Sequence, residues 1–234
     1  MQTLMEQNGL FLPADALARL ETYLSLLIEW NQRMDLTSVP DGEMAQRHFV
    51  DSLLPLTCDG LFPEGCSLID VGTGAGFPGL VLAAVRRDMQ VTLLEAQQKR
   101  CTFLQAVCAA LGLENVLIIH DRAETLGKAP AHREMYDRAV ARAVAPMNVL
   151  CEYLLPFVKV GGQAVCWKGP QVETERADGN AAAKKLGGGE MALLPMGQGG
   201  HVVACVKKAE KTLPQYPRKN GIPVKRPLKD DKKG

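Results

Sequence analysis

From residue 67 onward, short apolar runs alternate with helix-like segments, and this alternation constrains the fold more than any other feature of the sequence. The runs that predict strands cover residues 67–71, 90–94, 116–120, 136–141 and 163–167. The segments that predict helices lie between them, at residues 79–87, 98–111, 123–128 and 146–158. Strands joined through helices form parallel sheets with right-handed crossovers. The nearly continuous apolar character of the runs predicts burial on both faces of that sheet.

The end of this region departs from the alternation. A helix-like stretch at 173–186 leads into three consecutive glycines, and two strands follow at 190–194 and 201–206. The loop between the two strands is too short for a crossover helix, so they must be antiparallel neighbours. Five alternating strands closed by a hairpin predict a Rossmann-like, seven-stranded α/β sheet, mostly parallel, of the kind found in class I S-adenosylmethionine-dependent methyltransferases.

The first sixty residues read as helical. Leucines from Leu17 to Leu27 recur at helical spacing, and a second helix is expected from about Pro40 through Leu53. The tail contains many Pro, Lys and Arg residues, so we expect it to be extended. The predicted organisation is an N-terminal helical cap at 1–60, a methyltransferase domain at 61–209 and a basic tail at 210–234.

Overall composition names no partner, because the formal net charge is +1 and hydrophobic and charged residues make up 47% and 23% of the chain. The seven cysteines are odd in number and form no CxxC pair, so we expect no metal site and a reducing, cytoplasmic location. No apolar run is long enough to span a bilayer and the N-terminus lacks the pattern of a signal peptide, so no membrane partner is expected.

The turn after the first strand carries the strongest chemical signal. Asp70 precedes three glycines, Gly72, Gly74 and Gly76. Glycines allow positive φ and close approach of the backbone to a ligand, and the N-terminus of the following helix offers free N–H groups. A carboxylate at Asp70 can orient those amides and help hold the ammonium group of a methionine.

Glycine spacing alone leaves two cofactors open. Gly74, Gly76 and Gly79 satisfy the dinucleotide fingerprint, and Glu95 stands at the end of the second strand, where a carboxylate binds ribose hydroxyls. An NAD-linked oxidoreductase therefore remains a competing hypothesis. Asp70, the polar segment 121–124 after the third strand and the closing hairpin favour S-adenosylmethionine.

Further motifs along almost the whole chain carry a family resemblance. They are Trp30-Asn31, Asp35-Leu36-Thr37-Ser38, Arg47-His48-Phe49-Val50-Asp51-Ser52-Leu53, Asp70 to Gly79, Lys99 to Leu104, Arg122-Ala123-Glu124, Ala141 to Ala145, Lys168-Gly169 and Tyr216 to Pro223. With them the chain resembles the RsmG family, also called GidB, of bacterial 16S ribosomal RNA guanine-N7 methyltransferases. Two positions depart from the family pattern: Asp35 replaces a usual Asn and Ala141 a usual Ser.

The resemblance implies methyl transfer from S-adenosylmethionine to guanine N7 of 16S rRNA, either free or in the 30S subunit. It implies cofactor contacts at Gly72, Phe77, Ala123, Glu124 and Arg142, with the Phe77 ring packed on the cofactor. We expect the same of Asp70, Gly74, Gly76 and Glu95 from the turn itself. Guanine N7 carries a lone pair and no proton, so the transfer needs no general base.

We expect Arg142 and Arg122 to act in catalysis, Arg142 by contacting the base, a phosphate or only the cofactor. Arg47, His48 and Asp51 share a helix face and form either the mouth of the site or a buried polar lock between cap and domain, of which the lock is favoured. Basic residues are the candidates for RNA contacts, set against a merely solvated or solubilising role: Lys99, Arg100, Arg218, Lys219, Lys225 and Arg226. A cofactor-binding RNA scaffold without activity is a third hypothesis, and we expect a monomer.

Overall fold

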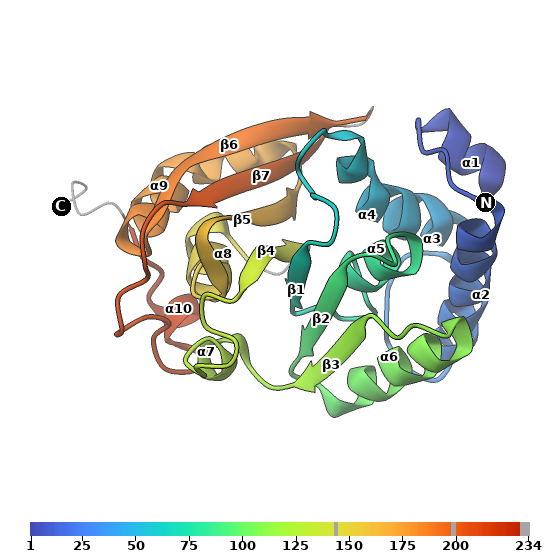
Figure 1. The fold of residues 1–234 in the computed structure, drawn as a ribbon, viewed down its shortest axis with the longest axis horizontal. Coiled ribbons are helices and arrows are strands. Elements are labelled where there is room, and N and C mark those ends of the chain that lie inside the picture. Colours follow the sequence, from blue (N-terminus) through green and yellow to red (C-terminus); the bar gives the residue numbers. More distant parts are fainter. Residues whose placement is uncertain (143–144, 198–199, 230–234) are drawn as a thin grey trace.

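The computed structural model describes residues 1–142, 145–197 and 200–229, and its centre is one seven-stranded sheet (Figure 1). The strand order is β3-β2-β1-β4-β5-β7-β6. Neighbouring strands are parallel from β3 to β5, whereas β7 is antiparallel to both β5 and β6. The strands are β1 (Ser67–Val71), β2 (Gln90–Glu95), β3 (Val116–His120), β4 (Tyr136–Arg142), β5 (Val158–Lys168), β6 (Gly188–Met196) and β7 (His201–Lys208).

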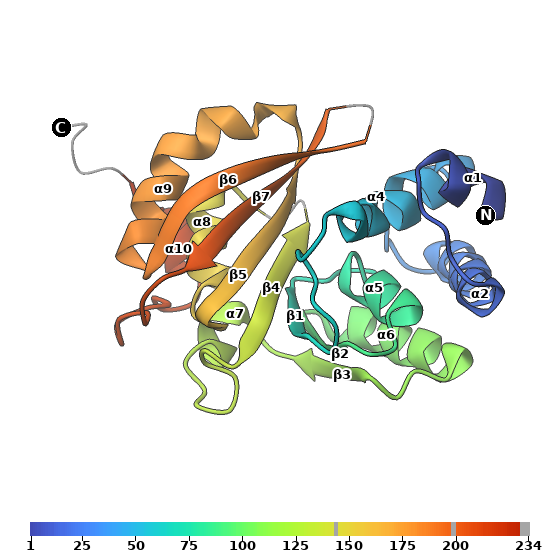
Figure 2. The same cartoon turned by 45° about the horizontal axis from the view of Figure 1, so that its top comes forward.

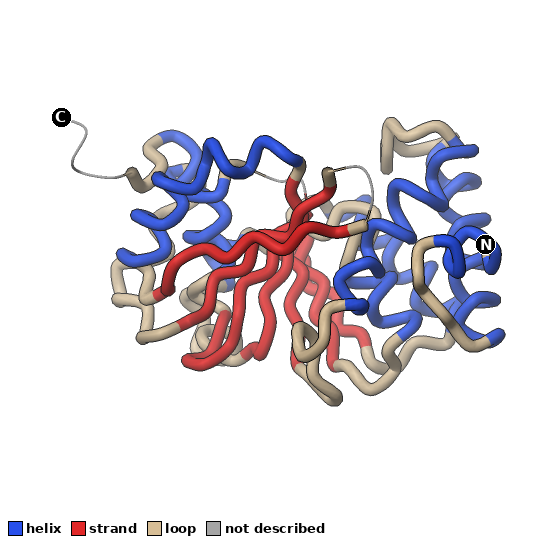
Figure 3. The backbone as a smooth tube through the Cα atoms, turned by 90° about the horizontal axis from the view of Figure 1, so that it is seen from above, coloured by secondary structure: helices blue, strands red, loops and turns tan. Residues whose placement is uncertain are grey.

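Helices cover both faces of the sheet, as Figure 3 shows from above. Side chains alternate along a strand, so Leu68 packs into one apolar cluster and Ile69 into the other. The cluster of Leu68 includes α5 (Gly79–Val85) and α6 (Gln98–Leu111), and that of Ile69 includes α8 (Met147–Leu154) and α9 (Arg176–Lys185). Burial on both faces explains why the central strands are apolar throughout.

The N-terminal helices pack beside α5 and α6, outside the sheet (Figure 2). They are α1 (Gln2–Gln7), α2 (Ala14–Asn31), α3 (Asp41–Met44), the π-helix η1 (Ala45–Val50), α4 (Asp51–Leu53) and the 3-10 helix η2 (Leu54–Thr57). Their buried side chains join the same cluster as Leu68. The division into cap, domain and tail stays a prediction, because these helices share their core with the sheet.

The fold class predicted from the alternation and the closing hairpin is confirmed, since the sheet has seven strands with an antiparallel β6–β7 hairpin. One helix was predicted too long: α8 ends at Leu154, and β5 already begins at Val158. Pro156 explains the difference, because proline cannot continue a helix and disfavours helical backbone in the residue before it.

The C-terminal tail is more ordered than the expected extended chain. It contains the one-turn helix α10 (Ile222–Lys225), and both Pro223 and Leu228 are buried. The segments η3 (Pro170–Glu175) and α7 (Ala123–Leu126) complete the elements. Within the described ranges, no helix is long and apolar enough to cross a membrane.

Candidate active site at the glycine turn

The glycine turn joins β1 to α5 at the carboxyl end of the central strand, where open α/β sheets bind ligands. Gly72, Gly74 and Gly76 have φ values of 72°, 61° and 97°, a region that side chains rarely adopt. A Cβ on Gly76 would collide with the Tyr23 hydroxyl of α2, and one on Gly79 would lie 2.6 Å from the Cβ of Asp70. The turn therefore needs glycine for conformation at three positions and for space at Gly79.

Asp70 is fully buried beneath this turn and holds its two ends together. One carboxylate oxygen accepts hydrogen bonds from the Thr73 hydroxyl at 2.6 Å and the Gly79 amide at 2.8 Å. The other oxygen is buried without a hydrogen-bond partner in the described protein. Burial raises the pKa of Asp70 to about 6. Because its carboxylate bonds both Thr73 in the turn and Gly79 at the start of α5, Asp70 supports the turn from below.

Glu95, at the end of β2, supports the turn from the side. Its carboxylate accepts the Gly74 amide at 2.9 Å and the Gln97 amide at 2.8 Å, and it is almost fully buried. The Arg100 guanidinium lies 3.9 Å from the same carboxylate. Each carboxylate oxygen has more than one lone pair, so Glu95 retains the capacity to accept a ribose hydroxyl.

The Phe77 ring, predicted to pack on the cofactor, packs against three protein side chains. Tyr23 stacks on the ring at 5.6 Å between centroids and 4° between planes, and His48 stacks on it at 4.5 Å and 17°. The Arg142 guanidinium also lies 4.8 Å from the ring centroid. Tyr23, His48 and Arg142 thus pack against the ring, and Phe77 is almost fully buried. A cofactor contact at Phe77 stays a prediction for its backbone and ring edge.

Arg142 ends β4 and ties the sheet to the N-terminal helices. Nη1 donates to Asp51 Oδ2 at 3.1 Å and to the carbonyl of Arg47 at 3.1 Å, and Nη2 donates to Nδ1 of His48 at 2.9 Å. Since arginine can only donate, Nδ1 of His48 must accept and Nε2 must carry the proton toward Thr37 Oγ1 at 2.7 Å.

Burial, reinforced by the charges of Arg142 and Arg47, lowers the pKa of His48 to about 4. His48 is therefore neutral at physiological pH. Asp51 also contacts His201 of β7, whose Nδ1 lies 3.1 Å from Oδ1 of Asp51. His48 and Asp51 thus form the predicted lock to Arg142, and at the same time line a cavity, so the two alternatives for this motif coexist.

Two adjoining cavities open at this cluster. The smaller, of about 300 Å³, is lined by the glycine turn from Gly72 to Ala75 and by Phe77. The larger, of about 1030 Å³, is lined by Asp51, Trp167, Lys168 and His201 among others. The residues that line both are Leu36, Thr37, His48, Arg100 and Arg142. Asp35, the departure from the family pattern, lines the larger cavity; the other departure, Ala141, is buried in the sheet.

The segment after β3 is not among the residues that line the two cavities. Arg122 precedes α7 with an exposed side chain, and it does not line the cavities that Arg142 lines. Glu124 is buried, and its carboxylate accepts the Gly221 amide of the tail at 2.8 Å. The structure therefore does not bring Arg122 together with Arg142, and the carboxylate of Glu124 already has a protein partner.

The basic residues predicted to contact RNA differ in their exposure and in their partners within the protein. Arg218 is paired within the protein, because its guanidinium and backbone amide both bind the fully buried Glu152, with an Nη2–Oε2 distance of 2.6 Å; an RNA contact at this residue stays a prediction. Lys99 is exposed on α6, whereas Arg100 faces the cavities. Lys219, Lys225 and Arg226 are exposed on the tail.

Two contributors to the site escaped the sequence reasoning. Tyr23, fully buried in α2, donates its hydroxyl to the carbonyl of Ala75 in the glycine turn. His201 reaches the site from β7, about 150 positions after Asp51. Tyr23 occupies an ordinary core position in the helical pattern, and His201 starts an ordinary strand, so neither carried a local signal. The motif residues Ala143 and Val144 lie outside the described residues.

Comparison with solved structures finds proteins of the same fold. A putative S-adenosyl-L-methionine-dependent methyltransferase from Methanococcus maripaludis aligns with a TM-score of 0.53 at 13% identity, over 73% of this chain and 91% of its own. A mutant of MtNAS in complex with S-adenosylmethionine aligns with a TM-score of 0.54 at 17% identity, over 82% of this chain and 75% of its own. These similarities show a shared fold.

Comparison of the sequence is more specific. The family described as GidB, rRNA small subunit methyltransferase G, matches residues 16–202. The protein named ribosomal RNA small subunit methyltransferase G from Alkaliphilus metalliredigens is 43% identical over 229 residues, covering 96% of this chain and 95% of its own. Its namesake from Alkaliphilus oremlandii is 45% identical over 212 residues, 88% of each chain. The predicted resemblance is thereby confirmed, and the chain belongs to the GidB family of small-subunit ribosomal RNA methyltransferases.

Proposed function

We propose that the protein transfers a methyl group from S-adenosylmethionine to N7 of a guanine in 16S ribosomal RNA. The observation that carries the proposal is the pair of adjoining cavities, one lined by the glycine turn and one open and partly cationic, with Arg142 in the wall common to both. The family membership supplies the substrate class. An enzyme acting on the small subunit works in the cytoplasm, and we propose that it acts as a monomer.

The residues of the turn fit the methionine part of the cofactor. Gly72 and Gly74 line the smaller cavity and have the positive φ values of a backbone left open to a ligand. S-Adenosylmethionine supplies an electrophilic methyl group on its sulfonium. Gly72, Gly74 and the edge of Phe77 would hold it, with Glu95 accepting a ribose hydroxyl and Ala123 and the Glu124 backbone bordering the adenosine end.

The larger cavity has the size and charge for a nucleotide presented by RNA. Arg100 and Lys168 contribute cationic side chains to its wall, while Arg142 stands between this cavity and the turn. The lone pair of guanine N7 attacks the methyl carbon, so the carbon–sulfur bond breaks and S-adenosylhomocysteine leaves with the bonding electron pair. Guanine N7 carries no proton, so no proton moves and the transfer needs no general base. Arg142 would act by positioning the reacting groups at this wall, and its place in the lining of both cavities supports it over Arg122 as the residue that assists the reaction.

Labelled methyl transfer tests the proposal. The purified chain is incubated with methyl-labelled S-adenosylmethionine and either 30S subunits or naked 16S RNA, and the modified base is mapped by mass analysis. We expect one 7-methylguanosine in 16S RNA. The proposal fails if the protein binds NADH but not S-adenosylhomocysteine. It also fails if 16S RNA from a deletion strain carries every methyl group found in the parent strain, a result that favours a scaffold without activity.

RNA contacts by Lys99, Lys219, Lys225 and Arg226 are part of the proposal, since all four are exposed cations. Removal of one phosphate contact should lower the slope of log affinity against log salt by about 0.7–0.9. We expect the triple variant Lys219→Ala, Lys225→Ala, Arg226→Ala to bind RNA more weakly and with a shallower salt dependence. Glu6→Gln and Glu21→Gln on the far N-terminal helices are matched surface changes and should leave the slope unchanged.

A further inference from the structure

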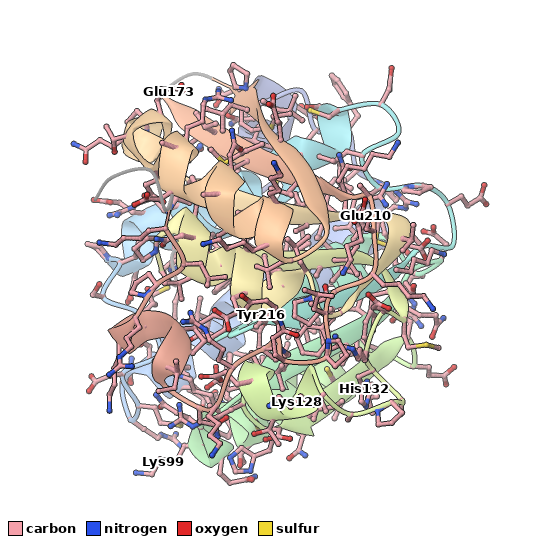
Figure 4. The ribbon with its side chains drawn as sticks, turned by 90° about the vertical axis from the view of Figure 1, so that its left-hand side faces the viewer. Lys99, Lys128, His132, Glu173, Glu210 and Tyr216 are labelled. Carbon is pink, nitrogen blue, oxygen red and sulfur yellow. The ribbon has the colours of Figure 1, made fainter. Side chains whose placement is uncertain are left out.

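The C-terminal segment from Thr212 to Lys229, here named the strap, crosses α8 and α7 after leaving β7. Figure 1 shows it as the red segment that contains α10 and runs beside α7 and α8, and in Figure 4 the labelled Tyr216 lies between α8 and Lys128, which follows α7. Arg133 fastens its start by donating to the carbonyls of Thr212 at 2.7 Å and Tyr216 at 2.8 Å. The strap is therefore bound to the domain along its length.

The first strong anchor of the strap is on α8. Glu152 has no exposed surface, and its carboxylate accepts the backbone amide, Nε and Nη2 of Arg218 at 2.6–3.1 Å. Asn148, one turn earlier on the same helix, donates to the carbonyl of Leu228 at 2.9 Å. A buried carboxylate is costly without a partner, so α8 in its present form requires the strap.

The second anchor is on α7. The Gly221 amide donates to Glu124 Oε1 at 2.8 Å, and the Thr125 hydroxyl donates to Asn220 Oδ1 at 3.3 Å. Pro217 packs so closely that a Cβ on Gly127 would lie 3.1 Å from its ring. A single helical turn is not stable alone, so these contacts determine where α7 sits.

The placement of α7 matters because hydrogen bonds through Glu95 connect the residue before it to the glycine turn. Asp121, just before α7, donates its amide to the Glu95 carbonyl at 3.2 Å, and the Glu95 carboxylate in turn accepts the Gly74 amide. Ala123 and Glu124 are the residues proposed to border the adenosine end of the cofactor. The Glu124 carboxylate is engaged by the strap, so what this segment offers a ligand is its backbone.

We propose that the strap is a structural part of the S-adenosylmethionine site. By holding Glu124 and α7 against α8, it positions the Ala123–Glu124 backbone as the wall of the adenosine end. Asn220 and Gly221 are thus positioning residues for cofactor binding, a role separate from any RNA contact of the exposed lysines. This inference rests on the proposed function.

The test compares Glu124→Leu, which cannot accept the Gly221 amide, with Glu124→Gln, which keeps an oxygen acceptor of nearly the same shape. The probes are S-adenosylhomocysteine and 5′-methylthioadenosine, whose adenosine end is the same but which lacks the amino-acid end. We expect Glu124→Leu to raise both dissociation constants about tenfold and by the same factor, measured by calorimetry. Glu124→Gln should stay within about twofold of the unchanged protein.

Two further proteins locate the effect. Arg100→Ala, in the wall of the glycine-turn cavity, should weaken S-adenosylhomocysteine more than 5′-methylthioadenosine, unlike Glu124→Leu, which should weaken both equally. A chain ending at Gln215, with Glu152→Met to avoid an unpaired buried carboxylate, should reproduce the loss seen with Glu124→Leu. Circular dichroism and thermal unfolding establish that each variant is folded at the temperature of measurement.

Unchanged affinity for both probes in the folded truncated chain overturns the role of the strap. If Glu124→Leu does not fold, Asn220→Ala combined with Pro217→Ala loosens the same contact from the other side and decides the question. Absence of S-adenosylhomocysteine binding by the unchanged protein is a different result: it removes the proposed function and this inference with it.

Discussion

At the residue scale, Arg142 has the most demanding environment in the site. Its guanidinium is largely buried and binds Asp51, the ring of His48 and the carbonyls of Arg47 and His48 at once. Burial lowers its pKa, although an arginine stays charged at any physiological pH. Only a planar group with several fixed donors can make this set of bonds, so the geometry selects arginine over lysine.

Arg142→Lys should therefore lower the rate of methyl transfer even though the charge is kept. We expect kcat/KM on the ribosomal substrate to fall at least about tenfold, equivalent to about 1.4 kcal/mol of transition-state stabilisation. Single-turnover transfer of labelled methyl measures it. Arg33→Lys, at an exposed pair with Glu29, is the matched control and should act like the unchanged protein. Equal rates for both variants would contradict the role of Arg142.

His48 predicts a pH dependence of stability. Its pKa falls from 6.5 to about 4 on folding, so between these values the unfolded chain binds more protons than the folded one. The effect of His48 on the free energy of unfolding is therefore most favourable above pH 6.5. As the pH falls toward 4, the free energy of unfolding decreases by about 2 kcal/mol after allowance for solvent at the ring edge. Asp70 acts in the opposite direction, because its raised pKa of about 6 costs stability as the pH rises from 3.8 to 6.

The difference in the free energy of unfolding between the unchanged protein and His48→Gln isolates the effect of His48, since Asp70 is present in both. Urea unfolding at pH 7 and pH 5 should show a free-energy difference that shrinks at the lower pH. His120→Gln, on the exposed end of β3, provides the control and should keep the pH dependence of the unchanged protein. Parallel pH profiles for the unchanged protein and His48→Gln would count against a neutral, buried His48.

At the element scale, short and irregular helices place the chemistry. The π-helix η1 carries Arg47 and His48, and the carbonyls of both accept hydrogen bonds from Arg142. A π-turn bonds each amide five residues back, and such turns are frequent at functional sites. The helix α5 approaches β1 so closely that Gly79 leaves no room for a side chain over Asp70.

Gly79→Ala tests that close approach. A methyl group there would lie 2.6 Å from Asp70 Cβ and 2.8 Å from Leu93 Cδ2, so α5 must shift. We expect a loss of about 1–3 kcal/mol in the free energy of unfolding, measured in urea. Gly42→Ala in α3 meets nothing within 4 Å and should be neutral or stabilising by up to about 1 kcal/mol. A Gly79→Ala protein as stable as Gly42→Ala would refute the steric argument.

At the scale of the whole molecule, segments far apart in sequence complete one site. Tyr23 of α2 binds the glycine turn, Asp51 bridges Arg142 of β4 and His201 of β7, and Arg218 of the strap neutralises Glu152 of α8. Both ends of the chain are thereby tied to the sheet, on opposite sides of it (Figure 2). Substitutions in the tail should consequently change the free energy of unfolding of the whole protein.

Arg218→Ala should cost about 3–5 kcal/mol, because it leaves the carboxylate of Glu152 buried and unpaired. Its neighbour Lys219 is exposed, and Lys219→Ala should change the free energy of unfolding by less than about 0.5 kcal/mol. Denaturant titration of the two variants separates an anchoring arginine from a solvent-facing lysine. Similar small losses in both would mean that the tail is not an anchor.

The sequence by itself determined the sheet, the hairpin and the glycine turn, because these arise from local patterns. Strands β1 and β3 and helix α6 have the predicted bounds, since short apolar runs and helical periodicity are local patterns that need no knowledge of distant partners. Glycines after a strand identified the ligand-binding turn by the same local logic, and the motifs indicated the family.

Only the tertiary structure decided which groups remain free to act. It packed Tyr23 and His48 against the Phe77 ring, paired Arg218 with Glu152, bonded the Glu124 carboxylate to the Gly221 amide and left Arg122 outside the two cavities that Arg142 lines. The physical reason is that a side chain's availability depends on what packs against it from elsewhere in the chain. A basic or aromatic residue in a motif has the same local signature whether its partner is a ligand or a buried carboxylate.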